Sequence, residues 1–524
     1  MTNFFSKITT FIKAHPKFDF AFVIAALVGF STIALFNITN ASIWFDEAFS
    51  AYIIQFNFWD IVKYTASDVH PPFYYWTLKV WTMVFGTNDL GLRSMSLFFA
   101  IATIIAAYFL ARKLFGRKIA LVSVLFLSVS PMIIRYADET RMYTMTAFIV
   151  VCAALAVMNA VQGRGRKWWV IYGVLIGLGM WTHYFTVFLW LAFWAWRAWA
   201  TYSKNITLGD WWKKFFSKYW VGAHVIAVAV FAPWLYFMAK QLGVVQAGGF
   251  WIGPVSIDTP SNYFTNLFYY LEHGQVQSWF AAALLIVLII VIALTPKVYK
   301  SFSKPERSNF VLITSLAWVP VILLFIMSLP PLRSSFVERY LIPATVMSMI
   351  FLAVVLVVGT RNWKPFFRAV PILLVVGMMI FGITNVYKYG NYNKNNDLHI
   401  VTRQVIEAVQ EKAQPGQPIV TDSPFLFYEA IQYTTEANPV YFIDANTQYT
   451  YGSLEMLKDN DMHKIKDINA FSRQYPVIWY LGQTPSNDVG AYLPTWVKLQ
   501  TVSYFDQLTY RTDYRATQYR INAE

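Results

Sequence analysis

Eleven apolar runs of near-spanning length dominate this chain and restrict what it can fold into. They lie at about 19–39, 92–111, 119–134, 144–161, 168–182, 184–202, 219–239, 278–295, 308–329, 340–360 and 369–386. Within a bilayer every backbone polar group must be satisfied internally, so such runs cross it as α-helices of about 20 residues. We therefore predict a polytopic α-helical membrane protein with about 11 transmembrane helices.

The composition and the charge distribution agree with this class. Of 524 residues, 57% are apolar and 13% are charged, and a single cysteine, Cys152, leaves no disulfide to form within the chain. The formal net charge of +14 could indicate a protein that binds nucleic acid. However, residues 1–386 hold 30 Lys and Arg against 13 Asp and Glu, whereas residues 387–524 hold 12 against 15. Because the basic excess lies in the membrane part, topology explains it, and no nucleic-acid partner is expected.

The loops between the runs predict the orientation of the chain. Of the 30 basic residues in 1–386, 22 fall on one set of alternate loops and 8 on the other. Since Lys and Arg favour the cytoplasmic side, we expect a multi-pass cell-membrane protein with a cytoplasmic N-terminus. The run at 19–39 has no small-residue cleavage site and is expected to remain as a signal anchor. Ten of the 13 carboxylates in 1–386 fall outside, so the chemistry is expected there.

A polar insert follows the first run and forms the first outer loop, 40–93. It opens with the adjacent carboxylates Asp46 and Glu47 and continues to Asp68-Val69-His70-Pro71-Pro72. Charged groups beside a span are costly to desolvate, which makes this cluster a candidate functional site. Asp68 and His70 could share a divalent ion, with Asp46 and Glu47 as further candidate ligands. Two ligands do not make a site, so a metal is an open alternative and His70 is better explained as a hydrogen-bonded loop residue.

Outer arginines form two groups that topology does not explain. In the segment from Arg135 to Arg141, the spacing allows Arg135 to pair with Asp138 or Glu139 on one helical face. The alternative is that Arg141 clamps a phosphate at the lipid surface, because a guanidinium binds phosphate oxygens bidentately. A second group is formed by Arg333, Glu338 and Arg339. For this group, a surface ion-pair cluster and a functional role are equally good interpretations.

These residues suit an enzyme that takes an activated substrate from the membrane. The sequence has no Gly-rich phosphate loop and no dinucleotide fingerprint, which argues against nucleotide chemistry in the cytoplasm. A polyprenyl-phosphate sugar fits an outer site, since its tail can lie between helices and its phosphate is the leaving group. Catalysis then needs a base for the acceptor hydroxyl and cations for the departing phosphate, which Asp46 and the arginines supply.

The aromatic residues of the first loop have two interpretations. Trp44, Trp59, Tyr74, Tyr75 and Trp76 suit helices that lie in the membrane interface, and sugars also stack on such rings. For any single ring, membrane anchoring alone is the better explanation.

Five boxes, taken in order, resemble the family 39 type of membrane glycosyltransferases in the GT-C superfamily. They are Asp46-Glu47, Asp68-x-His70-Pro71-Pro72-x-Tyr74-Tyr75, Glu139-x-Arg141-Met142-Tyr143, Thr182-His183-Tyr184-Phe185 and Arg339-Tyr340-Leu341-Ile342-Pro343. The match spans 40–343, and the order of the boxes is specific although each box alone is weak. Relatives include the dolichyl-phosphate-mannose protein mannosyltransferases and the lipid A aminoarabinose transferases.

This resemblance implies a GT-C core whose first outer loop contains two interfacial helices. It also implies a polyprenyl-phosphate sugar donor and inversion at the anomeric carbon. Asp46 would be the catalytic base, Glu47 would organise the site, and Arg141 would face the donor phosphate. The other residues carried over are Arg135 and Arg339 for phosphate, and Asp68, His70, Tyr74, Glu139, His183 and Tyr340 for substrate. Thr140 departs from the family, which more often has alanine before the arginine.

After residue 386 the composition becomes polar, and an asparagine-rich linker at 391–396 leads into a second domain. A helix at 397–412 and strand-like runs at 418–421, 440–443, 477–481, 497–505 and 514–522 predict a small α/β domain. We therefore divide the chain into a transmembrane catalytic domain, 1–386, and an extracytoplasmic α/β domain, 387–524. The second domain either caps the outer vestibule or selects the acceptor.

The prediction is thus a hexosyl- or pentosyltransferase that moves a sugar to a lipid, protein or glycan acceptor outside the membrane. The main alternative is a flippase or transporter of lipid-linked glycans. Transporters usually place charged or broken-helix sites near the bilayer midplane. Here the spans are nearly free of interior charge, which favours an enzyme. A sugar-binding or assembly subunit without activity is a third alternative.

Overall fold

The computed structural model describes residues 16–36, 38–248, 252–270, 276–389, 400–443, 455–459, 461–483, 496–507 and 511–521. Its contacts divide the chain into two units, which we describe separately. The membrane unit comprises Met1–Phe36 and Ser94–Val386, and the composite unit comprises Asn37–Arg93 and Tyr387–Glu524. The contacts thus group the loop after the first span, Asn37–Arg93, with the C-terminal segment, whereas the sequence suggested one division at residue 386.

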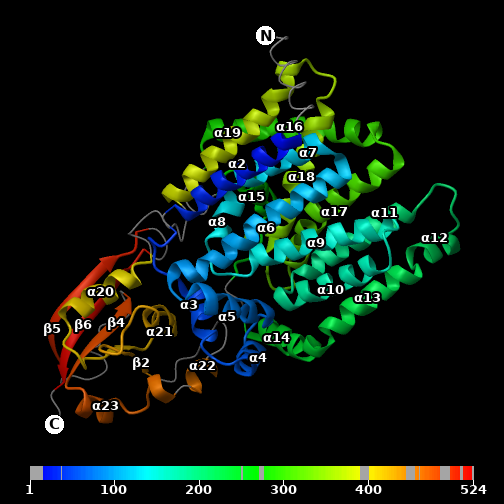
Figure 1. Ribbon diagram of the computed structural model, residues 1–524. Helices are drawn as coiled ribbons and strands as arrows, with labels where there is room; N and C mark the ends of the chain where they lie inside the picture. Colours follow the sequence, from blue (N-terminus) through cyan, green and yellow to red (C-terminus); the bar gives the residue numbers. More distant parts are fainter. Residues whose placement is uncertain are drawn as a thin grey trace. The chain divides into compact units, whose positions relative to one another are not determined.

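All secondary-structure elements among the described residues of the membrane unit are helices (Figure 1). Its helices are α2 (Pro16–Leu35), α6 (Asp89–Phe115, which begins in the composite unit), α7 (Arg117–Ser128), α8 (Pro131–Ala137), α9 (Tyr143–Val161), α10 (Lys167–Thr182), α11 (Thr186–Thr201), α12 (Leu208–Phe215), α13 (Lys218–Phe231), η1 (Ala232–Trp234), α14 (Leu235–Gly248), α15 (Thr259–Asn266), α16 (Ser278–Ser301), α17 (Lys304–Met327), η2 (Glu338–Leu341), α18 (Ile342–Gly359) and α19 (Pro365–Tyr389).

Every predicted apolar run falls on helix in the described part of the chain, which confirms the polytopic helical class. Among the described residues, eight helices are long and apolar enough to cross a membrane, or up to nine if one bent pair counts as one span. That pair is α7 and α8, which meet at 59° just before Pro131. Helices α10 and α11 have 16 residues each and are too short to be counted among these spans. The number of 11 transmembrane helices therefore stays a prediction.

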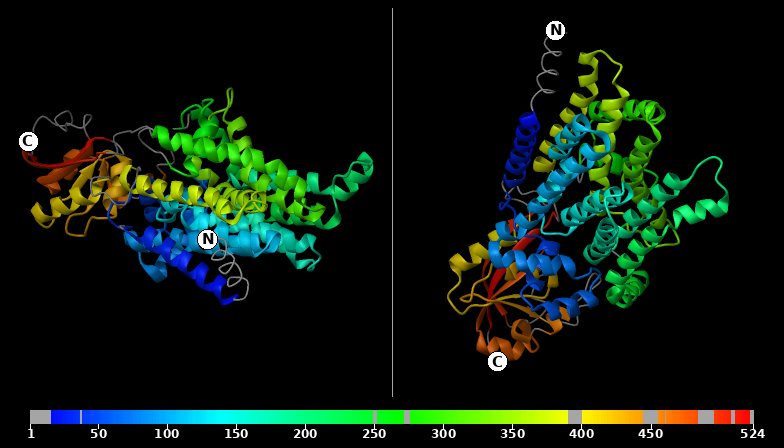
Figure 2. Two further views of the ribbon diagram at one scale, coloured as in Figure 1. Left: turned by 90° about the horizontal axis from the view of Figure 1, so that it is seen from above. Right: turned by 45° about the vertical axis from the view of Figure 1, so that its right-hand side comes forward.

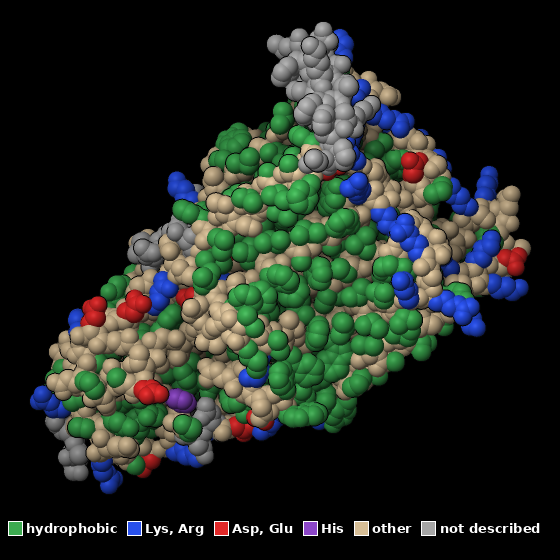
Figure 3. Space-filling model, in the orientation of Figure 1, with side chains coloured by type: hydrophobic (Ala, Val, Ile, Leu, Met, Phe, Trp, Pro, Cys, Tyr) green, Lys and Arg blue, Asp and Glu red, His purple; other side chains and the backbone are tan. Residues whose placement is uncertain are grey.

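Close helix packing in the membrane unit depends on small residues. A Cβ atom on Gly173 would lie 2.3 Å from the Ala223 carbonyl oxygen, and one on Gly177 would lie 2.7 Å from the Val230 Cβ. These glycines, one turn apart on α10, let α13 approach closely, as is common where lipid removes the hydrophobic drive between helices. Apolar side chains cover much of the visible face of this unit (Figure 3). Figure 2 shows its helices from two further sides.

The composite unit combines helices from the first loop with an α/β segment. The first loop forms α3 (Phe45–Ile53), α4 (Phe58–Ser67) and α5 (Phe73–Phe85), where the resemblance implied two helices. Asn57 caps the start of α4, its side-chain oxygen accepting from the backbone N–H groups of Trp59 and Asp60. Gly86, at φ 82°, ends α5 in a conformation that favours glycine.

The C-terminal segment adds a six-stranded sheet. Its elements are α20 (Thr402–Lys412), β1 (Ile419–Thr421), α21 (Pro424–Ile431), β2 (Val440–Ile443), α22 (Glu455–Lys458), η3 (Asp461–His463), β3 (Lys464–Ile465), α23 (Ile468–Gln474), β4 (Val477–Gln483), β5 (Trp496–Phe505) and β6 (Asp513–Ile521). The strand order is β3-β2-β1-β4-β6-β5, with parallel pairing from β3 to β4 and antiparallel pairing of β6 with both neighbours.

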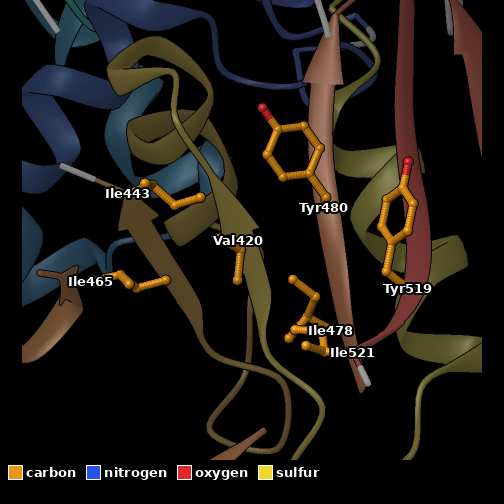
Figure 4. Packing of buried hydrophobic residues seen from close by; sticks show 7 residues of the cluster. All are labelled: Val420, Ile443, Ile465, Ile478, Tyr480, Tyr519 and Ile521. Atoms are coloured by element: carbon orange, nitrogen blue, oxygen red, sulfur yellow. The ribbon is translucent and has the colours of Figure 1, made fainter. Parts of the chain in front are cut away.

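This sheet confirms the predicted α/β character, because all five predicted strands are present. The short β3 was not predicted, since two residues carry no periodic signal. One face of the sheet holds a core of Val420, Ile443, Ile465, Ile478, Tyr480, Tyr519 and Ile521 (Figure 4). The predicted linker at 391–396 and the start of the predicted helix at 397–399 lie outside the described residues.

Candidate functional site

Asp46, the predicted base, lies in the first turn of α3 in the composite unit. A carboxylate in this position is stabilised by the helix dipole, by about 0.3–1 kcal/mol where it is exposed. Asp46 is half-buried, whereas its neighbour Glu47 is completely buried. The two adjacent carboxylates therefore have different surroundings, and only Asp46 keeps some exposure to solvent.

Glu47 forms a buried, bidentate ion pair with Arg93. The Arg93 Nε atom donates to one carboxylate oxygen at 2.9 Å, and the Nη2 atom donates to the other at 2.8 Å. Both side chains are completely buried. Breaking such a pair leaves an uncompensated buried charge, so both partners are fixed in place. These contacts support an organising role for Glu47 and leave Asp46 as the better candidate for proton transfer.

Arg93 also holds the chain that leads into α3. It donates to the backbone carbonyls of Ile38 at 2.7 Å, Ala41 at 3.0 Å and Ser42 at 3.0 Å. Sequence reasoning missed this role. The available signal was an arginine at the start of an apolar run, where burial without several partners would be costly.

Asp68, His70 and Tyr74 have structural contacts within the composite unit. Asp68 follows the last turn of α4, and its carboxylate lies 3.2 Å from the His70 Nδ1 atom. This pair agrees with the interpretation of His70 as a hydrogen-bonded loop residue. Tyr74 is completely buried and packs against Tyr75 with ring centroids 5.4 Å apart. Trp44 and Tyr75 are buried within this unit, so their rings are not exposed for membrane anchoring. Trp59, in contrast, is 82% exposed.

The candidate metal ligands do not come together as a set. Among the described residues, no group of three or more His, Cys, Asp and Glu side chains could hold a metal ion. Arg93 engages both oxygens of Glu47, so this carboxylate fits a structural ion pair better than a metal ligand. We therefore derive no step of the chemistry through a metal.

In the membrane unit, Arg135 and Glu139 form a buried ion pair. Their Nη1 and Oε2 atoms lie 2.7 Å apart, and the side chains are 3% and 1% exposed. The predicted pairing at i and i+4 is confirmed for Glu139. The Arg135 guanidinium also lies 5.1 Å from the ring centre of Tyr136. Because Glu139 neutralises it, Arg135 is better suited to supporting the site than to binding phosphate directly.

Arg141 lies in the turn between α8 and α9 and is 4% exposed. Ser96 on α6 fixes this turn, because its hydroxyl donates to the backbone carbonyls of Glu139 and Arg141. The turn is closed further by the Arg141 N–H, which donates to the Glu139 carbonyl at 2.7 Å. Sequence reasoning did not identify Ser96, because a serine within an apolar run gives no distinctive pattern.

Aromatic rings bring three distant segments of the membrane unit together. The Tyr340 ring stacks on Phe185 with centroids 4.5 Å apart, and it lies 4.9 Å from His183. Tyr143 lies 5.9 Å from His183 and 6.2 Å from Tyr340. The Arg339 guanidinium is 6.0 Å from the Tyr143 ring. Of the five boxes that carried the resemblance, the first two lie in the composite unit and the last three lie in the membrane unit, where they meet here.

This arginine–aromatic cluster consists of Arg135, Glu139, Arg141, Tyr143, His183, Phe185, Arg339 and Tyr340. Guanidinium groups buried among rings bind phosphate oxygens strongly, since little water competes for them. The rings offer apolar faces to a lipid or a sugar. The proximity of this cluster to Asp46 stays a prediction.

Comparisons with known proteins bear on the fold and on part of the site. A family model described as dolichyl-phosphate-mannose-protein mannosyltransferase matches residues 69–237. This range includes His70, Arg135, Glu139, Arg141 and His183 but neither Asp46 nor Tyr340. No curated protein matches the sequence.

Two solved structures share the fold over almost the whole chain. The apo structure of ArnT from Cupriavidus metallidurans matches with a TM-score of 0.60 and 14% identity, covering 97% of this chain and 99% of that one. The structure of the same ArnT bound to undecaprenyl phosphate matches with a TM-score of 0.56 and 14% identity, covering 95% and 97%.

The fold is therefore that of a GT-C membrane protein, with multiple membrane-spanning helices and C-terminal strands. The chain is similar to the dolichyl-phosphate-mannose-protein mannosyltransferase family over residues 69–237, and it shares its fold with ArnT.

Proposed function

We propose that this protein is an inverting glycosyltransferase that uses a polyprenyl-phosphate sugar on the extracytoplasmic side of the membrane. The observation that carries the proposal is the arginine–aromatic cluster, which gathers the Arg141, His183 and Tyr340 boxes at one place in the membrane unit. The GT-C fold supports it, and so does the undecaprenyl phosphate bound by an ArnT of the same fold.

The proposed reaction is a displacement at the anomeric carbon. Asp46 accepts the proton of the acceptor hydroxyl as the acceptor oxygen bonds to that carbon. The bond between the carbon and the phosphate oxygen breaks at the same time, and its electron pair leaves with the phosphate. Arg141 and Arg339 stabilise the charge that develops there, while Arg135 and Glu139 hold the turn. Asp68, His70, Tyr74, His183 and Tyr340 shape the substrate site.

The sidedness of the reaction follows from the loop charges. With 22 basic residues on one set of loops and 8 on the other, the N-terminus lies in the cytoplasm and the C-terminal segment outside. The acceptor is a lipid, a protein or a glycan that reaches this side, and the sugar is a hexose or a pentose.

The test is sugar transfer by the full-length protein reconstituted in liposomes that contain polyprenyl-phosphate sugars. We expect transfer by the wild type and its loss in Asp46→Asn. The matched control is Asp60→Asn, which changes an aspartate of the same loop that hydrogen-bonds to Asn57. Translocation of the lipid-linked sugar without any transfer would favour a flippase and overturn the proposal.

A further inference from the structure

The helix that carries Asp46 is not capped by the side chain of its own N-cap residue. Trp44 occupies that position with an extended backbone and makes no side-chain capping hydrogen bond. The first N–H groups of a helix have no partner within the helix, and they need an acceptor when buried. The N-terminus of α3 is therefore held by another part of the composite unit.

The acceptor is Glu429 on α21, which lies 384 positions after Phe45 in the sequence. The backbone N–H of Phe45, the first residue of α3, donates to the Glu429 carboxyl group. The Thr402 hydroxyl donates to the Glu429 Oε2 atom at 2.5 Å and fixes its orientation. Glu429 is 2% exposed, so no solvent competes for these bonds.

Aromatic packing places α21 against α3 along its length. Phe45 lies 4.4 Å from Phe425 between ring centres. Tyr428 packs against Phe49 at 6.0 Å and against Tyr52 at 5.1 Å. Because these contacts run along α3, the carboxyl group of Glu429 is held at the helix end and cannot shift independently of α3.

The residues just before α3 are bound to the same C-terminal helices. The Ile43 N–H donates to the Tyr433 hydroxyl at 2.7 Å, and that hydroxyl donates to Asp89 at 2.9 Å. The Arg403 N–H donates to the Ser42 hydroxyl at 2.9 Å. The chain entering α3 is thus fixed by α20 and α21 on one side and by Arg93 on the other.

We propose that Glu429 is a positioning residue for Asp46, and that the C-terminal segment is a structural part of the catalytic site. This inference rests on the proposed role of Asp46 as base. It assigns to residues 402–433 the task of fixing the start of α3, so that the Asp46 carboxylate points in one direction.

The charge state of Glu429 fits this task. Burial raises the pKa of Glu429 to about 8, and the nearby carboxylate of Asp506 raises it further, while the bonds from Thr402 and Phe45 oppose the shift. At neutral pH the group is therefore mostly neutral. A glutamine at this position has the same shape and also offers an oxygen to the Phe45 N–H.

The experiment compares Glu429→Gln with Glu429→Leu in the full-length protein. Hydrogen exchange is measured on the peptide covering 44–53, which contains α3. We expect faster exchange in Glu429→Leu and near-normal protection in Glu429→Gln. The matched control is Gln417→Leu, which removes hydrogen bonds from Trp479 and Gln518 within the same segment and makes no described contact with α3. Unchanged exchange in Glu429→Leu would overturn the inference.

Sugar transfer supplies the second readout. Displacement of a catalytic group by about 1 Å can cost about 100-fold, so Glu429→Leu should lower kcat by about 10- to 100-fold with little change in donor KM. Glu429→Gln should restore the rate. An equal loss in Gln417→Leu would mean a general structural effect and overturn the positioning role. Where Glu429→Leu does not fold, Thr402→Val tests the same bond, and it should raise exchange in the same direction.

The two readouts separate the two proposals. If the wild type transfers no sugar, the proposed function fails, but the exchange of α3 still reports whether Glu429 holds the helix. If transfer occurs and Glu429→Leu transfers as fast as the wild type, only the positioning role fails.

Discussion

The membrane unit and the composite unit hold their candidate site residues by different means. In the membrane unit, Arg135 pairs with a residue four positions away, and the rest of the cluster is joined by ring contacts between helix ends. In the composite unit, the helix bearing Asp46 is held by polar groups from about 360 to 390 positions further along the chain. Local ion pairing and ring contacts therefore predominate in the membrane unit, whereas around α3 long-range hydrogen bonds add to the aromatic packing against α21.

This difference predicts distinct consequences of substitution. Changes in the arginine–aromatic cluster should alter how the donor is used, because these groups would contact phosphate and lipid. Changes around α3 should alter the rate of proton transfer or the stability of the composite unit. Each prediction below tests one side of this contrast.

The largest effect is expected for Asp46→Asn. General base catalysis increases the rate by about 100- to 10,000-fold, and the asparagine amide cannot take up the proton of the acceptor hydroxyl at neutral pH. We expect kcat for sugar transfer to fall by that range while donor KM and thermal stability stay near the wild-type values. Turnover within a factor of a few of the wild type would remove Asp46 from the mechanism.

The next effect concerns stability and the buried pair of Glu47 and Arg93. Arg93→Met leaves Glu47 as a buried, unpaired charge and should lower the free energy of unfolding by about 3–5 kcal/mol. The double variant Arg93→Met with Glu47→Leu should recover most of that loss, because two apolar groups replace both charges. Denaturant unfolding of the three proteins measures both changes.

The control for this pair is Lys63→Met. It breaks the pair between Lys63 and Asp459, which is largely exposed. Water and salt screen exposed ion pairs, so this substitution is expected to change stability little. Equal destabilisation by Lys63→Met and Arg93→Met would contradict the special role of the buried pair.

In the membrane unit, Arg141→Ala should reduce donor use by about 10- to 100-fold, since a hydrogen bond to a charged group contributes about 1.5–3 kcal/mol. The expected change is in kcat/KM for the donor, with acceptor KM nearly unchanged. Arg141→Lys should restore part of the activity, because lysine keeps the charge but not the bidentate geometry. Arg333→Ala, an exposed arginine of the same unit, is the control.

The pH dependence of stability tests the composite unit. In the folded protein Glu429 keeps its proton up to a pKa of about 8, whereas the unfolded chain loses it near pH 4 to 5. The unfolded state therefore binds fewer protons between these values, and stability falls as pH rises, by about 1 kcal/mol per unit from this group, before levelling above pH 8. Glu429→Gln should flatten this slope in unfolding experiments between pH 5 and 8. An unaltered slope would show that another group titrates.

The smallest effect is expected for Tyr340→Leu. This change removes the ring contacts with Phe185 and His183, and aromatic pairs contribute about 0.5–1.5 kcal/mol beyond burial. A modest rise in donor KM and a small loss of stability should result. Tyr236→Leu, an exposed tyrosine of the same unit, should change neither quantity.

The sequence predicts well those features that follow a repeating pattern or that join residues close together in the chain. The apolar runs mark the helices of the membrane unit, strand-like runs mark β1, β2, β4, β5 and β6, and four-residue spacing marks the pair of Arg135 and Glu139. The contacts of Arg93, Ser96 and Glu429 join segments far apart in sequence, where no spacing rule applies. The family resemblance selects candidate side chains for the site, but it does not reveal what holds them.

The central claim is that Asp46 of the composite unit and Arg141 of the membrane unit act on one donor molecule. A cryo-EM structure of the protein with undecaprenyl phosphate tests it most directly. We predict a phosphate within hydrogen-bonding distance of Arg141, with the Asp46 carboxylate facing the position of the sugar. A phosphate bound away from Arg141, or an Asp46 side chain directed away from the phosphate, would contradict the account.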